Sequence, residues 1–142
     1  MPREVARLSG ERAFELFEKA KPALARAMLS SRVIDPEKVE AIRYDDDSIL
    51  WSFSLESEDK AKGLVSWVYN TLSALKEIMD ISNIDEKKIN NKRVILVYTQ
   101  YPNIREKYPS AFWHDDSKFY WLESGHNPES FEELLWELLG ES

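Results

Sequence analysis

The feature that most limits the possible folds of this chain is the stretch "RVILVYTQ", Arg93 to Gln100. Its apolar residues do not alternate with polar ones, so a strand formed here carries apolar side chains on both faces. Such a strand must be covered from both sides, which predicts a central strand in a covered sheet. The uncharged apolar run, Val94 to Tyr98, is far too short to cross a bilayer, and we expect no membrane segment.

Two further stretches predict β-hairpins. In the first, "VEAIRYDDDSILWSFSLES", apolar and polar residues alternate from Ile49 to Leu55, the period of a half-buried strand. Its turn is expected at Asp45–Ser48, where aspartate side chains cap backbone N–H groups. The second, "AFWHDDSKFYWLESGH", runs from Ala111 to His126 and has its expected turn at "DDSK".

Helical periodicity predicts helices at both ends of the chain. Near the N-terminus, Ser9 is the expected cap of a helix over Glu11–Ser30, which Pro22 should kink or split. At the other end, Asn127 is the expected cap of a helix over Pro128–Leu139.

The longest predicted helix covers Glu58–Asp80, with Ser57 as its cap. It has a wide apolar face and a second, narrower stripe. We expect both to be buried, although an exposed second stripe would favour a partner. The wide face consists of Ala61, Leu64, Val65, Val68, Leu72, Leu75 and Met79, and the second stripe of Trp67, Thr71, Ala74 and Ile78.

Together these elements predict a single α+β domain over residues 1–142, in the order α-ββ-α-β-ββ-α. The expected sheet is mixed or antiparallel, has about five strands and carries the helices packed on it. The polar stretch Ile81–Lys92 is interpreted as a loop.

Composition narrows the function. The net charge is −7, from 19 Lys and Arg against 26 Asp and Glu, which makes a nucleic-acid partner unexpected. Lys87, Lys88, Lys92 and Arg93 form a small basic cluster, interpreted as a solvated loop. No N-terminal apolar run resembles a signal peptide, and cysteine is absent, so we expect a cytoplasmic protein without disulfides. The single glutamine and the abundant Glu, Lys and Arg are typical of thermophiles.

The second hairpin contains metal-ligand residue types, but its geometry separates them. If "DDSK" is the turn, His114 lies near the tip and His126 beyond the opposite end. Strand steps of about 3.3 Å place them roughly 17 Å apart, whereas zinc needs nitrogen ligands at about 2 Å. We therefore predict that the two histidines do not share a metal, and that neither Asp115, Asp116 nor Glu123 completes a metal site with them.

The alternative is an enzyme. Glu58-Asp59-Lys60 has the E-x-K form at a strand end, and the element order over roughly residues 11 to 100 resembles PD-(D/E)xK nucleases. The resemblance implies Mg²⁺ bound by carboxylates, with Glu56, Glu58 and Lys60 as site residues. Two observations count against this alternative and favour a protein without catalytic residues or a cofactor. The partner aspartate should oppose Glu58, yet the Asp45–Asp47 turn lies at the far tip, and capping by Ser57 explains the acids of the first turn.

The element order is also similar to roadblock and longin-like scaffold domains, although no residue motif carries that similarity. We expect a small acidic, non-catalytic interaction or regulatory protein. Its partner is another protein or a second copy, and exposed Trp67, Ile78, Trp113 and Trp136 are the expected anchors. The predicted homodimer should be weakened by Trp136→Glu or Trp67→Glu. A third hypothesis is that the protein is a decoy for basic, nucleic-acid-binding surfaces, which predicts carboxylates in regular rows on one face.

Overall fold

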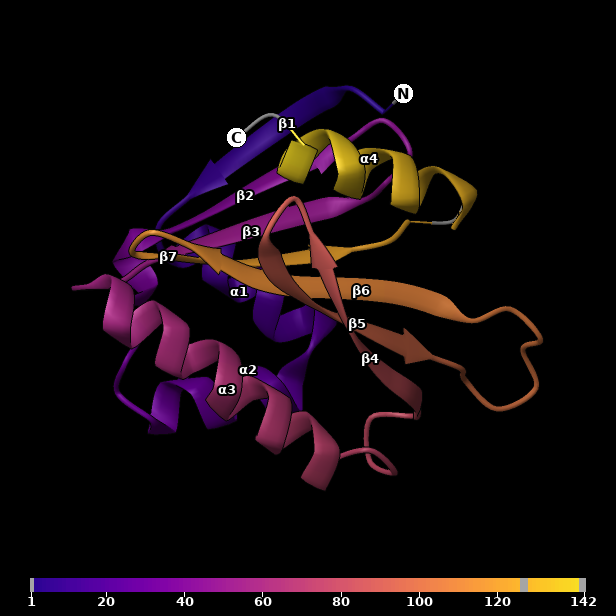
Figure 1. Cartoon of the computed structure of the whole chain (residues 1–142), viewed down its shortest axis with the longest axis horizontal. Coiled ribbons are helices and arrows are strands. Elements are labelled where there is room, and N and C mark those ends of the chain that lie inside the picture. The colour runs from indigo at the N-terminus through magenta and orange to yellow at the C-terminus, as the bar shows by residue number, and fades with distance from the viewer. Residues whose placement is uncertain (1, 126–127, 141–142) are drawn as a thin grey trace.

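The computed structural model describes residues 2–125 and 128–140. Over these residues the chain is α+β, with four α-helices and one antiparallel sheet of seven strands in the order β1-β2-β3-β7-β6-β5-β4 (Figure 1). The α+β class predicted from the sequence is therefore confirmed, with more strands than expected. The strands are β1 Glu4–Ser9, β2 Val39–Tyr44, β3 Ile49–Ser54, β4 Ile81–Ile89, β5 Lys92–Thr99, β6 Tyr108–Asp115 and β7 Lys118–Glu123.

The helices of the described chain lie on both faces of the sheet (Figure 1). Three of them cover one face, and the last lies across the other. Because helices cover both faces, the sheet lies between two hydrophobic cores. The first face carries α1 Glu11–Ala20, α2 Pro22–Ser30 and α3 Glu58–Ala74, and the second carries α4 Glu129–Gly140.

The first predicted helix is split rather than continuous. Pro22 is the first residue of α2, and Lys21 before it has φ −137° and ψ 68°, outside the helical region that a following proline disfavours. The expected cap at Ser9 is wrong. Ser9 is the last residue of β1, and Gly10 precedes α1 at a φ of 71°, a left-handed conformation that suits glycine.

Both predicted hairpins are present, as β2–β3 and β6–β7, and they pair with each other through β3 and β7. Trp51 lies opposite Trp121 in that pairing. The predicted cap of α3 is also confirmed, because the Ser57 hydroxyl accepts a hydrogen bond from the Lys60 backbone N–H at 3.2 Å.

Two strands were missed by sequence reasoning, and both are edges of the sheet. The stretch interpreted as a loop, Ile81–Lys92, instead contains β4. Only Ile81 and Ile89 are buried in this strand, so its sequence lacks an apolar period. In β1 every residue except Leu8 is exposed. Edge strands rich in charged side chains resist edge-to-edge aggregation, and the same charges hide them from a search for hydrophobic patterns.

Helix α3 is shorter than predicted, since regular helix ends at Ala74 and residues 75–80 form turns. Asp80 closes this segment with a φ of 56°. Ile78 therefore lies outside the helix, and its side chain is 73% exposed. The second stripe predicted on a helix over Glu58–Asp80 is consequently not a continuous helical face.

The larger core lies between the sheet and the first three helices, and Phe17 of α1 is at its centre. The ring of this residue makes edge contacts with Trp51 at 5.1 Å and with Phe53 at 5.2 Å between centroids. The Trp51 indole N–H donates to the Ala13 carbonyl at 3.0 Å, so this buried polar group is paired. Aromatic alternation in the predicted hairpins thus places these rings against α1.

Strand β5 lies between the two cores, as its lack of alternation predicts. Val94 and Leu96 belong to the core under α4, whereas Ile95 and Val97 belong to the core on the other face. All four side chains are buried. The apolar stretch of β5 therefore supplies side chains to the cores on both faces of the sheet.

Candidate functional site: the groove beside helix α4

Helix α4 is fixed over the sheet at both ends. In its first turn, the Ser130 hydroxyl donates to the Asp46 carboxylate in the β2–β3 turn. Near its last turn, the Asn90 side chain donates to the Leu139 carbonyl at 2.9 Å. The chain leading to α4 passes so close to the β2–β3 turn that a Cβ at Gly125 would collide with the Asp46 carbonyl, which explains the glycine.

The Asp46 carboxylate is suited to this anchoring role. Partial burial acts to raise its pKa, but hydrogen bonds from Ser130 and Ser48 outweigh burial and hold the pKa below its usual value. Asp46 is therefore ionised at neutral pH and accepts from both hydroxyls. The position of α4 follows from these contacts.

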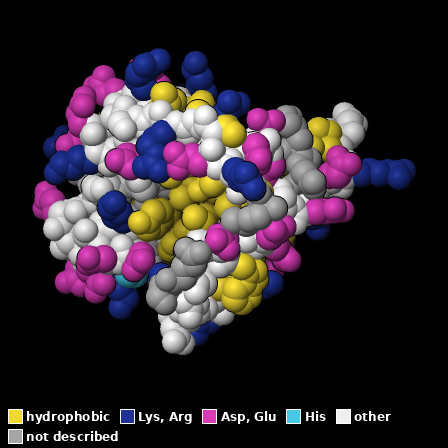
Figure 2. Space-filling view, turned by 90° about the horizontal axis from the view of Figure 1, so that it is seen from above, with side chains coloured by type: hydrophobic (Ala, Val, Ile, Leu, Met, Phe, Trp, Pro, Cys, Tyr) yellow, Lys and Arg dark blue, Asp and Glu magenta, His cyan; other side chains and the backbone are white. Residues whose placement is uncertain are grey.

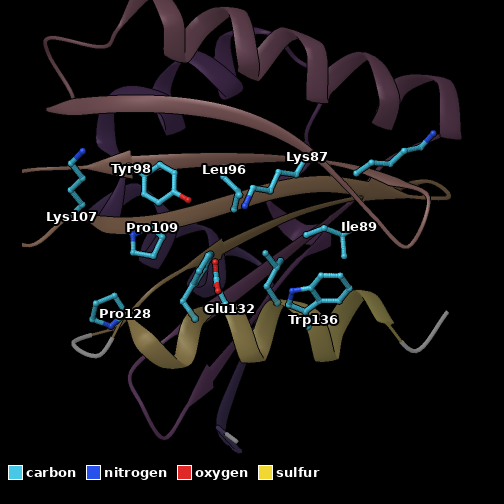
Figure 3. Close-up of a pocket in the computed structure, with 12 residues that line it drawn as sticks. Lys87, Ile89, Leu96, Tyr98, Lys107, Pro109, Pro128, Glu132 and Trp136 are labelled. Carbon is cyan, nitrogen blue, oxygen red and sulfur yellow. The ribbon is translucent and has the colours of Figure 1, made fainter.

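Between α4 and strands β4–β6 the structure has a groove with a volume of about 360 Å³, which we call the α4 groove (Figure 3). Its apolar lining includes Leu96 of β5 and Phe131 and Leu135 of α4. These three side chains are buried. A groove of this volume with an apolar lining is typical of small-molecule and peptide sites.

Polar groups line the groove from both sides. Lys87 of β4 and Lys107, just before β6, lie on the strand side, whereas Glu132 and Trp136 project from α4 (Figure 3). Side chains two residues apart on a strand share a face, so Lys87 faces α4 together with buried Ile89. The groove therefore combines an apolar floor with a rim that carries charge.

Tyr98 of β5 adds a phenol group to the groove lining. Partial burial raises the pKa of this phenol, and the nearby carboxylates of Asp85 and Glu132 raise it further. The phenol is consequently neutral at ordinary pH and can donate a hydrogen bond.

Trp136 is the exposed aromatic residue of this site. Its side chain is 56% exposed, while Phe131, Leu134 and Leu135 on the inner face of α4 are buried. The exposure expected for Trp136 from the sequence is therefore present, and the residue lies off the buried face of α4. Figure 2 views the molecule from above Figure 1 and shows hydrophobic side chains in the middle of this face, with charged side chains of both signs around them.

The other predicted anchors differ in position and exposure. Trp67 of α3 is half-buried against the larger core, on the opposite face of the sheet from α4. Ile78 is exposed beyond the end of α3. Trp113 was expected at the surface, but it is only 3% exposed and stacks on Tyr120 at 5.4 Å between centroids. The expectation that Trp113 is exposed is wrong, because its side chain lies on the face of β6 that packs in the core under α4.

The residues of the nuclease alternative lie together at the start of α3, and all are exposed. The Lys60 ammonium forms an ion pair with the Glu56 carboxylate at 2.8 Å, and this hydrogen bond lowers the pKa of Glu56. Glu58 lies in the first turn of the capped helix. Within residues 2–125 and 128–140, no three His, Asp or Glu side chains are placed to hold a metal ion.

Two acidic residues of the second hairpin form ion pairs within the protein. Asp115 lies 3.1 Å from the Lys92 ammonium, and Glu123 lies 3.2 Å from that of Lys21. His114 is at the tip end of β6, as the hairpin predicts. His126 lies outside the described residues, so the predicted separation of the two histidines stays a prediction.

The lysines of the groove rim were not identified as a site from the sequence. Lys87 and Lys88 were noted as part of a basic cluster, but they were assigned to a loop rather than to β4. Lys107 and Tyr98 come from other segments and reach the groove only through the order of the strands. The sequence feature that could have indicated this site was the basic cluster, because it occurs in a chain with more acidic than basic residues.

Comparison of the chain with protein-family models, curated proteins and solved structures found no match. Among the described residues, no helix has the length and apolar character needed to cross a membrane.

Proposed function

We propose that this protein is a small, non-catalytic interaction protein that pairs with a second copy of itself through Trp136 and the α4 groove. The observation that carries the proposal is the 56% exposure of Trp136 beside an apolar groove. Tryptophan is enriched among the residues that dominate binding energy at protein interfaces. Twofold pairing is the commonest way to cover such a surface.

Charge complementarity supports a second copy as the partner. Glu132 lies one helical turn before Trp136, so both project from the same side of α4. A copy that presents Trp136 to the groove of its partner also presents Glu132 to the lysines of the rim. In a twofold interface this contact occurs twice, and it places carboxylates of an acidic chain against its lysines.

The first test is the oligomeric state, measured by light scattering over a concentration series. We expect a dimer for the natural sequence, and Trp136→Glu should weaken it by at least about thirty-fold, since a tryptophan anchor contributes about 2 kcal/mol or more. The monomer should remain folded, as measured by circular dichroism, because the side chain is largely exposed.

Ile78→Glu is the matched control, because it introduces the same charge at a 73% exposed apolar residue that lies beyond the end of α3 and does not line the α4 groove. A protein that is monomeric at every concentration contradicts the proposal. A dimer disrupted by Ile78→Glu and not by Trp136→Glu also contradicts it. Trp67→Glu is less informative, because Trp67 is half-buried and the change would also affect folding.

A second arm tests the twofold contact. Lys87→Glu and Glu132→Lys should each weaken the homodimer, because each places like charges opposite one another. An equimolar mixture of the two variants should form heterodimers, in which both contacts pair opposite charges. Two variants that remain monomeric when mixed would show that these side chains do not meet across the interface.

A further inference from the structure

The lysines at the rim of the α4 groove differ from several other lysines of the chain. Lys21, Lys60 and Lys92 each form an ion pair with a carboxylate. Over the described residues, neither Lys87 nor Lys107 forms an ion pair, although the chain has more acidic than basic residues. Two lysines without an ion pair thus line an apolar groove, with Lys87 beside Leu96 and Lys107 at the end of the groove beyond Tyr98 (Figure 3).

The opposite side and the floor of the groove offer contacts of another kind. Leu96 and Leu135 present apolar surface, and Trp136 contributes an indole ring with one N–H donor. The Tyr98 phenol lies on the same face of β5 as Leu96. Because the carboxylate of Glu132 lines the α4 side, a ligand that satisfies all of these groups has an apolar body and an anionic head on the strand side, near the lysines.

We propose that the α4 groove binds a small amphipathic anion, a carboxylate on an aliphatic or aromatic body. Its apolar part lies over Leu96 and Leu135 and against Trp136, and its carboxylate pairs with Lys87, while Lys107 adds positive charge at the end of the groove. The volume of about 360 Å³ is within the range of small-molecule sites. This inference uses the groove of the proposed function but does not depend on self-association.

Ligand binding and pairing use the same surface, so they should compete. A ligand that binds only the free groove shifts the equilibrium toward the monomer by mass action. The occupied groove would therefore regulate the proposed dimer.

The test is titration with decanoate and with decan-1-ol, which share the aliphatic body and differ in the anionic head. Binding is followed by NMR through the indole N–H resonance of Trp136, assigned by its loss in Trp136→Phe. We expect decanoate to bind at least about tenfold more tightly than decanol, because a hydrogen bond to a charged group contributes about 1.5 kcal/mol or more.

The variant Lys87→Gln/Lys107→Gln should remove this preference and leave decanol binding within about twofold of its original value. The matched control is Lys19→Gln/Lys62→Gln, which removes two exposed lysines on α1 and α3, across the sheet. This control should bind decanoate as the natural sequence does.

Three results would overturn the inference: equal affinity for decanoate and decanol, decanoate binding that survives loss of both rim lysines, or binding of a hexaglutamate peptide with none of decanoate. Light scattering of the same samples reports the oligomeric state separately. A monomer that binds decanoate through the lysines would contradict the proposed pairing and support the ligand site, whereas a protein that dimerises but does not bind decanoate even when diluted to the monomer would do the reverse.

Discussion

Replacing Glu123 with alanine should lower the free energy of unfolding by about 3–5 kcal/mol, because it leaves a buried ammonium without its carboxylate. Lys21 is 6% exposed, and its ammonium lies 3.2 Å from Glu123 Oε2. The other carboxylate oxygen accepts from Ser110 and from the Trp121 indole N–H, both at 2.8 Å. Chemical denaturation at neutral pH measures the loss.

Two further variants separate charge from packing at this site. In Lys21→Met/Glu123→Gln the ion pair is absent, while the glutamine oxygen can still accept from Trp121, so most of the lost stability should return. Glu56→Ala removes an exposed ion pair with Lys60 and should cost less than about 1 kcal/mol. A loss below about 1 kcal/mol for Glu123→Ala would mean that the Lys21 ammonium reaches water when its partner is removed.

The second large effect is expected at Leu72, where substitution by alanine should cost about 2–5 kcal/mol. Leu72 is fully buried on the wide apolar face of α3, one turn after Val68, and both belong to the larger core. The cost has two parts, the lost burial of the side chain and the cavity left between α3 and the sheet. Thermal or chemical unfolding of the variant provides the measurement.

Asn70→Ala is the matched control for this prediction. Asn70 is exposed on the same helix, so its replacement should change stability by no more than about 0.5 kcal/mol. If Leu72→Ala cost less than about 1 kcal/mol, α3 would have to pack on the sheet through a different face in solution.

Much of the interior could be predicted because burial leaves a periodic trace in the sequence. The alternation of Trp51 and Phe53 with serines identified β3, and the uninterrupted run in β5 identified a strand covered on both faces. The edge strands leave no such trace. Of the nine residues of β4 only Ile81 and Ile89 are buried, so hydrogen bonding to β5, rather than side-chain pattern, makes it a strand.

Only part of the candidate site could be predicted from the sequence. Helical spacing placed Trp136 off the inner face of α4, which is a local property of one element. The same reasoning could not find Trp113 buried, because both faces of β6 are covered in the sheet. Nor could it bring Lys87, Tyr98 and Lys107 together, since they come from different segments of the chain.

The sequence by itself therefore determined the local structure: the two aromatic hairpins, the covered strand, the capped start of α3 and the outward direction of Trp136. Each depends on side-chain periodicity or on contacts within a few residues. The tertiary structure alone decided that α4 crosses the face opposite the other helices and leaves a groove beside β4 and β5. That arrangement depends on pairing between distant strands and on anchors such as Asp46 to Ser130, which are 84 residues apart, and no local pattern encodes them.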